Sequence, residues 1–292
     1  MTAPVQITDV FLRDGLQDEP VFVPVHDRLS IAEALTAAGV RSLEVASVVN
    51  PARVPQMAGA DELIAALPPG GPARHSVLAL NGRGVERAVA AGAREINVAV
   101  SAGQSHSRAN AGRTTEQALD ELAAAIGKAA ADHPEITFYG AVSTAFNCPF
   151  DGEIRPDRLG AIVGRFTEMR VARIGLADTL GTAPTTQVVR ALKAVRSAFP
   201  DAVLSLHLHN ALGQALATVD AALELGVTHF DSAVGGYGGC PFAPGAHGNL
   251  DTRELVAHLH ASGVITGIDE GTLAEAFALV RARLARAEPV TS

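Results

Sequence analysis

The chain has little of what several protein classes depend on. Its 292 residues include no tryptophan, only 4% aromatic residues and two cysteines, and its Lys and Arg residues are scattered without basic runs at a formal net charge of −8. An acidic chain without a basic patch is a poor partner for nucleic acid or for an anionic membrane. No apolar run reaches the roughly 18 residues that a membrane span needs. We therefore expect neither nucleic acid nor a membrane as a partner.

The two cysteines and the first residues bear on the compartment. Cys148 and Cys240 lie far apart and in unlike contexts, which favours a reducing compartment over a single disulfide. A strand pattern starts by about Val5, which leaves no room for a signal or transit peptide before it. These features predict a cytoplasmic protein.

Apolar β-rich runs alternate with amphipathic segments along the whole chain. The expected strands are residues 5–12, 42–47, 75–80, 95–100, 136–143, 173–178, 203–209 and 228–234, with helix-like segments between them. Eight βα units without a linker predict an α/β fold, a single (β/α)8 TIM barrel over residues 1–292, with 250–287 as extra closing C-terminal helices. A doubly wound open sheet is the alternative, but no strand is followed by a GxGxxG loop.

The stretch VLSLHLHNALG at 203–213 carries the strongest chemical signal. His207 and His209 are two residues apart in a strand, so both imidazoles project from one face near the carboxyl end, where barrels bind ligands. Such a pair suits Zn, Mn, Fe or Ni, or Mg if oxygen ligands complete the shell, and structural core histidines are the alternative. Asn210 is expected to cap the next helix, whose apolar stripe begins at Leu212.

A second HLH triplet provides an internal comparison. His258 and His260 lie in an apparent helix, where positions two apart face different directions. We therefore interpret these two histidines as structural.

Polar side chains cluster where the expected strands end. In a barrel these positions line the active site, although any one of them alone is equally consistent with a helix cap or a structural pair. They are Arg13, Asp14 and Gln17 after the first strand, Glu44 in the second, Asn97 and Ser101 around the fourth, and Asp178 and Thr179 after the sixth.

The segment GGYGGCPFAPGAHGNL at 235–250 follows the last strand. Its glycines and prolines leave little capacity for regular structure, so it predicts a mobile lid loop that presents Cys240 as a reactive thiol, with a small buried hydrophobe as the alternative. The amide oxygen of Asn249 is a candidate cap acceptor or hard-metal ligand.

Five segments together resemble one known family. FLRDGLQDE, LEVASVVNPARVPQMAG, LADTLGT, LHLHN and GGYGGCPFAPGAHGN are similar to 3-hydroxy-3-methylglutaryl-CoA (HMG-CoA) lyases, which belong to the DRE-TIM metallolyases. The resemblance implies a divalent cation, Mg or Mn, held by Asp14, His207, His209 and Asn249.

The same resemblance assigns the remaining roles. It implies Arg13 as the cation beside the reacting thioester, Glu44 and Gln17 as supporting polar groups, and Cys240 as the catalytic cysteine on a flexible lid. Either Cys240 or His207 would deliver the final proton. We also expect Asp178 and Thr179 to contact substrate.

The reaction implied is cleavage of HMG-CoA, or of a longer branched 3-hydroxyacyl-CoA such as an isohexenylglutaryl one, to acetyl-CoA and a keto acid. The partners expected are an acyl-CoA substrate and further copies of the chain, as a homodimer or higher homo-oligomer. The alternatives are a condensing synthase of the same superfamily, an HxH metal hydrolase and a non-enzymatic acyl-CoA-binding barrel. Departures from the family pattern at Gly103, Gln104, 147–150, Tyr237 and His247 fall on loops expected to meet the acyl group.

Overall fold

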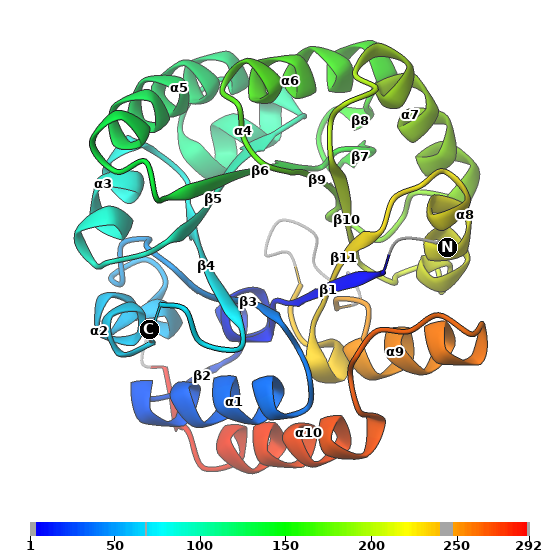
Figure 1. Cartoon of the computed structure of the whole chain (residues 1–292). Helices are drawn as coiled ribbons and strands as arrows, with labels where there is room; N and C mark the ends of the chain where they lie inside the picture. The colour runs from blue at the N-terminus through cyan, green and yellow to red at the C-terminus, as the bar shows by residue number, and fades with distance from the viewer. Residues whose placement is uncertain (1–3, 68, 240–247, 291–292) are drawn as a thin grey trace.

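The computed structural model describes residues 4–67, 69–239 and 248–290. Eight parallel strands form a closed barrel in the order β1-β11-β10-β9-β6-β5-β4-β3 (Figure 1). The barrel strands are β1 Gln6–Asp9, β3 Ser42–Ser47, β4 Arg74–Ala79, β5 Glu95–Ser101, β6 Thr137–Ser143, β9 Ile174–Asp178, β10 Leu204–Leu208 and β11 His229–Ser232. Pairing of Thr8 with Ser42 closes the ring between β1 and β3. The TIM barrel expected from the βα alternation is confirmed.

The helices surround the barrel and cover its outer face (Figure 1). They are α1 Val25–Ala37, α2 Ala60–Ala66, α3 Gly82–Ala90, α5 Thr115–Asp132, α6 Pro156–Glu168, α7 Thr185–Ala198 and α8 Ala215–Glu224, whereas the short helix α4 Gln104–Ala111 lies outside this ring. Leu206 and Leu176 on the outward face of their strands are fully buried. Burial of such apolar side chains between strands and helices is the main force that holds the layers together.

Two further helices follow the last strand. These are α9 Thr252–Ala261 and α10 Glu270–Leu284, and the side chains of Asp251 and Asp269 cap their first turns. Helix α10 lies beside α1 (Figure 1), and Arg283 Nε is 3.1 Å from Asp27 Oδ1 between them. The extra C-terminal helices therefore complete the outer ring next to the first helix of the chain.

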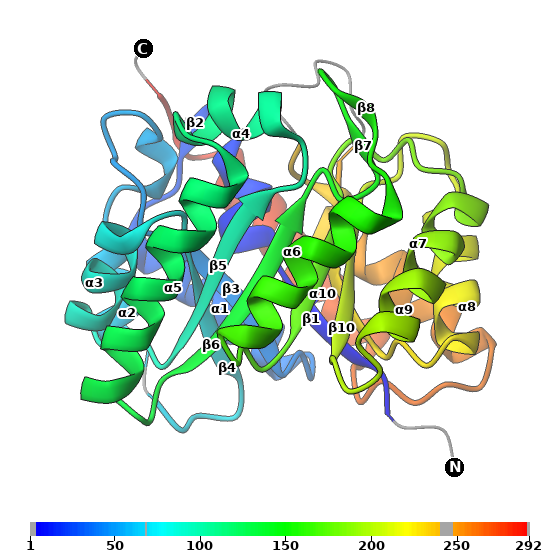
Figure 2. The same ribbon diagram turned by 90° about the horizontal axis from the view of Figure 1, so that it is seen from above.

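The short elements gather at the carboxyl ends of the barrel strands. Helix α4 and the β7–β8 hairpin (Asn147–Cys148, Gly152–Glu153) lie at one end of the barrel, as does the β2–β12 pair (Val21–Phe22, Glu288–Pro289) (Figure 2). This end carries the longer loops, as in other barrels. No helix in the described ranges is long and apolar enough to cross a membrane.

The first strand is shorter than its apolar run predicts. Strand β1 ends at Asp9, and a π-helical turn, η1, occupies Phe11–Gly15. The buried Asp9 carboxylate accepts hydrogen bonds from the backbone of Phe11 and Val234 and from the Thr252 hydroxyl, at 3.0, 2.9 and 2.6 Å. These contacts end the ladder. The last strand also stops early, at Ser232, and a 3-10 turn, η3 Val234–Gly236, follows it.

The helix expected directly after Asn210 begins later than predicted. Helix α8 starts at Ala215 and Leu212 is 49% exposed, so the apolar stripe does not extend that far back. The Asn210 side chain still accepts a hydrogen bond from the Ala215 backbone at 3.1 Å. Asn210 therefore caps helix α8 although it lies four residues before the N-cap position, Gln214. The sequence pattern did not reveal the turn between them.

Candidate active site

The two histidines of strand β10 converge at its carboxyl end. His207 Nε2 and His209 Nε2 are 3.1 Å apart, and His209 is almost fully buried. His258 and His260 instead pair separately, with Asp220 and Glu270, each at 2.7 Å. His207 and His209 therefore share one site. His258 and His260 each pair with a separate acidic residue at the surface, as expected for structural histidines.

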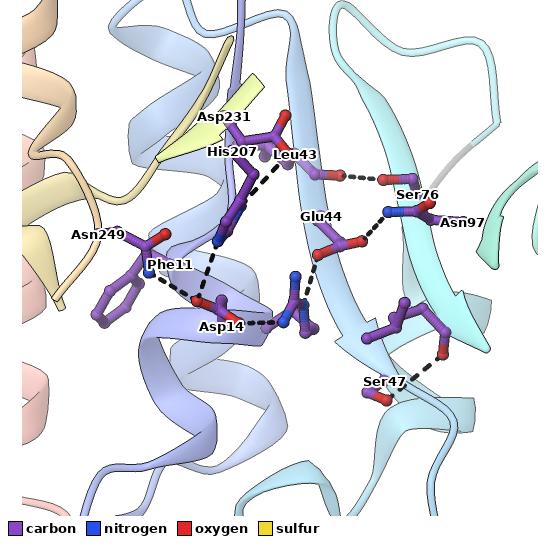
Figure 3. Close-up of polar contacts among 12 residues, drawn as sticks. Phe11, Asp14, Leu43, Glu44, Ser47, Ser76, Asn97, His207, Asp231 and Asn249 are labelled. Atoms are coloured by element: carbon purple, nitrogen blue, oxygen red, sulfur yellow. Dashed lines mark hydrogen bonds and ion pairs between the residues drawn. The ribbon is translucent and has the colours of Figure 1, made fainter. Parts of the chain in front are cut away.

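Asp14 joins the histidine pair from the π-helical turn. Its Oδ2 is 3.8 Å from His207 Nε2 (Figure 3), and it is 3.6 Å from His209 Nε2. Such π-turns are rare and often occur at functional sites. Here the turn aims a carboxylate at residues nearly two hundred positions later in the chain. These three side chains offer ligand atoms that all lie within 4.8 Å of one another.

Asn249 closes the same site from the far end of the chain. Its Nδ2 donates to Asp14 Oδ2 at 2.7 Å and to the Tyr237 carbonyl at 2.9 Å, while its Oδ1 is buried without a hydrogen-bond partner among the described residues. Asp251, and not Asn249, caps helix α9. Of the two roles expected for the Asn249 amide, the cap is therefore wrong.

Arg13 is held between two carboxylates. Its Nε donates to Glu44 Oε2 at 2.5 Å and its Nη1 pairs with Asp14 Oδ1. Glu44 is only 2% exposed, and its other oxygen accepts from Asn97 Nδ2 at 2.8 Å (Figure 3). Both Glu44 oxygens are therefore engaged, which fixes the Arg13 side chain in one orientation.

Burial and opposite charges set the ionisation of the site. Burial works against the charge of Arg13, but Asp14 and Glu44 outweigh it and raise its pKa above the ordinary value. Burial also favours neutral Asp14, yet Arg13 and the two imidazoles hold its pKa well below the usual range. Burial opposes protonation of His207, but Asp231 and Asp14 raise its pKa, whereas burial lowers that of His209. The cluster is thus a carboxylate and a guanidinium that stay charged beside two imidazoles.

These side chains line a cavity of about 1280 Å³ that opens at the carboxyl ends of the strands. Gln17, Ser101 and Thr179 also line it, as expected, although Thr179 uses its hydroxyl to accept from the Thr144 backbone at 2.8 Å. Asp178 is placed differently. Its carboxylate does not line the cavity but accepts from the Ala183 backbone at 3.0 Å, and burial raises its pKa to about 6 against the backbone hydrogen bonds that lower it.

Two acidic residues of the site, the buried Asp9 and the partly exposed Asp231, were missed in the sequence. Asp9 organises the turn that carries Arg13, and Asp231 Oδ2 lies 3.5 Å from His207 Nδ1 on the neighbouring strand. Alternation in THFDSAV places Asp231 two residues after His229 on the face that points into the barrel. That alternation could have predicted Asp231 as a site residue. No local sequence pattern predicts the role of Asp9.

Cys240 and His247 lie outside the described residues. Gly239, the residue before Cys240, lines the cavity. Cys148, the other cysteine, is buried in strand β7 as a free thiol. The catalytic role of Cys240 stays a prediction.

A family model described as HMGL-like matches residues 4–280. The chain belongs to the HMGL-like family. Its curated relatives are CoA lyases, so this HMGL-like protein is a carbon–carbon lyase. The resemblance to HMG-CoA lyases is confirmed.

Three relatives show how far the HMGL-like match extends. An (R)-citramalyl-CoA lyase from Chloroflexus aurantiacus is 40% identical over 98% of this chain and 92% of its own length, and a hydroxymethylglutaryl-CoA lyase from Pseudomonas mevalonii is 35% identical over 97% and 93%. An HMG-CoA lyase from Acinetobacter baumannii, solved with coenzyme A and 3-methylmalate, superposes with a TM-score of 0.91 at 34% identity, covering 100% of this chain and 95% of its own.

The HMGL-like site has the donors that a divalent cation needs. Asp14, His207 and His209 form a possible metal site, and the unpartnered Oδ1 of Asn249 lies on a side chain that already contacts Asp14. A carboxylate and an amide oxygen beside two imidazoles fit a cation that prefers mixed oxygen and nitrogen ligands.

Proposed function

We propose that this protein is a divalent-metal-dependent lyase that cleaves a tertiary 3-hydroxyacyl-CoA into acetyl-CoA and a keto acid. The observation that carries the proposal is the Arg13 guanidinium, oriented by Glu44 and paired with Asp14 directly beside the histidine pair. This arrangement sets a fixed positive charge next to a metal site, which is what cleavage of a carbon–carbon bond beside a thioester requires.

The metal ligands proposed are Asp14, His207, His209 and Asn249, and the cation proposed is Mg or Mn. A cation held there would supply Lewis acidity that lowers the pKa of the tertiary hydroxyl of the substrate. The acid and amide oxygens favour these hard cations over a closed tetrahedral zinc site.

Arg13 is proposed to stabilise the negative charge that develops on the thioester oxygen. Its guanidinium remains protonated at any working pH and is fixed by Glu44, so little reorganisation accompanies the reaction. When the bond between the carbinol carbon and the methylene breaks, the hydroxyl proton passes to a base or to water, the carbinol becomes the carbonyl of the keto acid, and the electron pair of the broken bond moves into the enolate of acetyl-CoA. A proton from Cys240 or His207 then completes acetyl-CoA.

The cavity mouth has charges that suit coenzyme A. Arg53 and Arg83 line the cavity, and neither side chain has an ion-pair partner in the described part of the chain. Two uncompensated guanidinium groups favour the phosphates of an acyl-CoA. Gln17 and Thr179 are proposed to contact the acyl group, while Asp178 is expected to act through the loop that it holds.

HMG-CoA is the first substrate that we propose, which would yield acetyl-CoA and acetoacetate. (R)-citramalyl-CoA is a second candidate, because the Chloroflexus aurantiacus relative that bears its name is 40% identical over almost the whole chain. That thioester is also a tertiary 3-hydroxyacyl-CoA, one methylene shorter, and would yield acetyl-CoA and pyruvate.

A panel of thioesters distinguishes these possibilities. HMG-CoA, both enantiomers of citramalyl-CoA and an isohexenylglutaryl-CoA are each assayed with Mg or Mn for release of acetyl-CoA and of the matching keto acid. Turnover of at least one of them supports the lyase. A protein that binds stoichiometric metal but turns over none would instead be the acyl-CoA-binding barrel, and net condensation with a 2-oxo acid would indicate the synthase.

The organisation of the protein is proposed on the same basis. We propose that residues 1–292 act as a single catalytic domain, that the protein assembles as a homodimer or higher homo-oligomer, and that it works in the cytoplasm. Light scattering after size exclusion measures the oligomeric state, and fractionation of the source cells tests the compartment.

A further inference from the structure

The barrel interior is hollow and polar in its amino-terminal half. The interiors of such barrels are ordinarily filled by layers of Val, Ile and Leu side chains. Here small or polar residues of that half line the catalytic cavity, together with two larger ones. The small residues are Thr8, Ser76, Gly175 and Ser205, and the larger ones are Tyr139 and Arg173. A small polar solute that enters the cavity can therefore reach the lower half of the barrel.

Arg173 is a cation in this space without a counter-ion. Its guanidinium carbon lies 4.6 Å from the centroid of the Tyr139 ring, and its side chain forms no ion pair or hydrogen bond within residues 4–67, 69–239 and 248–290. The carboxylate of Glu95 is already engaged, since it accepts from the Tyr139 hydroxyl at 3.0 Å and lies 3.8 Å from Arg74 Nε. Glu95 is thus committed to Arg74 and Tyr139.

A hydroxyl and a glycine lie just above Arg173. Gly175 is two residues after Arg173 on the same face of the strand, and it pairs with Ser205 on β10. The Ser205 hydroxyl has no hydrogen-bond partner in the described ranges. A Cβ placed on Gly175 would lie only 3.2 Å from that oxygen, so glycine leaves space beside a free donor.

His229 reports the local electrostatic potential. It pairs with Ser205 in the ladder, and its pKa is lowered to about 4, first by burial and then by the charges of Arg173 and Arg74. Its imidazole is therefore neutral near pH 7. The charge of Asp231 opposes this shift, but Arg173 and Arg74 outweigh it, so the local potential at His229 is positive.

We propose that Arg173, Ser205 and the space beside Gly175 form a binding site for a small oxyanion, of carboxylate or phosphate size. A guanidinium offers paired donors to such an anion, and the serine hydroxyl supplies a further one. The site is separate from the metal centre. Arg173 lies four residues before Ala177, which pairs with His207, a separation of about 13 Å along the strand. The inference does not depend on the proposed lyase reaction.

Calorimetric titration tests the site directly. Sulfate, inorganic phosphate and acetate are titrated separately into chelator-treated wild type, Arg173→Gln and Arg190→Gln. Arg190 is the matched control, because it is exposed and already paired with Glu153. We expect saturable binding of at least one anion to wild type, an affinity about 10-fold or more lower in Arg173→Gln, and no change in Arg190→Gln. The anion that binds most tightly shows whether the site prefers a carboxylate or a phosphate-like group.

Two further variants distinguish loss of the anion site from loss of the fold. Ser205→Ala removes one donor and Gly175→Val fills the space, and both should weaken the same anion while the far-UV circular dichroism stays native. Bromide-soaked crystals should show an anomalous peak at Arg173. Absence of saturable binding to wild type, or equal affinity in wild type and Arg173→Gln, overturns the proposal. Acetyl-CoA release by the variants is measured in parallel, so failure of this site and failure of the lyase are seen separately.

Discussion

His207 Nε2 and His209 Nε2, which come from residues two apart on one face of a strand, lie 3.1 Å from each other. Two imidazole nitrogens at that distance need a proton or a cation between them, because their lone pairs otherwise repel. Asp14 contributes a carboxylate to the same point. The two histidines and Asp14 therefore converge on a position suited to positive charge.

The first prediction concerns the metal. Chelation should abolish acetyl-CoA release, and Mn or Mg should restore it. His209→Ala should lower Mn affinity by about 10-fold or more, since a ligand is lost. His258→Ala, which removes a surface histidine paired with Asp220, should bind Mn normally. Metal content and calorimetry measure this, and unchanged Mn affinity in His209→Ala would contradict the assigned site.

The second prediction concerns Arg13. Arg13→Lys should lower kcat and kcat/KM together by about 10²-fold or more, because a point charge on a flexible stem cannot keep both the Glu44 and Asp14 contacts and also face the oxyanion. Arg165→Lys, which alters an exposed arginine paired with Asp120, is the control. Steady-state kinetics on the best thioester of the panel measure both variants. A change confined to KM would show that Arg13 only binds substrate.

The third prediction concerns the two cysteines. Cys240→Ser should lower kcat by about 10²-fold with metal still bound, because a serine hydroxyl is a far weaker acid than a thiol. Cys148→Ser changes a buried thiol of strand β7 and should cost little turnover. A thiol reagent should inactivate the wild type, and bound acyl-CoA should protect it. Near-wild-type turnover of Cys240→Ser on every thioester would remove the catalytic role of that thiol.

The fourth prediction concerns pH and Asp9. Burial raises the Asp9 pKa to about 6 against hydrogen bonds that lower it, so the folded state binds the proton more tightly than the unfolded state. The stabilisation from the neutral acid is present below about pH 4 and is lost as pH rises through about 6. The free energy of unfolding of wild type minus that of Asp9→Asn should therefore fall by about 2 to 3 kcal/mol between about pH 4 and pH 8.

Urea titrations across that pH range measure the difference. Asp178, whose pKa is also raised to about 6, is common to both proteins, so its contribution cancels. Asp61→Asn is the matched control, because it makes the same substitution at an exposed carboxylate beside Arg87. A pH-independent difference for Asp9→Asn would show that Asp9 remains ionised in the folded protein.

Much of the fold and part of the site follow from local pattern. Apolar runs alternate with amphipathic segments, and this repeat alone predicts parallel strands covered by helices. The two-residue spacing of His207 and His209 places both rings on one face of a strand without any reference to the rest of the chain. Position at strand ends marked Arg13, Asp14 and Glu44 as candidate site residues, and resemblance to a known family then added their roles and the chemistry.

The remaining features arise only when distant segments meet. The sequence does not show that Asp9, near the amino terminus, accepts a hydrogen bond from Thr252, or that Arg13, four residues later, donates one to Glu44. Nor does it show that Arg173, packed on the Tyr139 ring, has no ion-pair partner among the described residues of a hollow barrel. Periodicity along a strand states which face a residue occupies. The closure of the barrel decides what lies opposite that face, and so decides burial, ionisation and the empty space that a ligand can use.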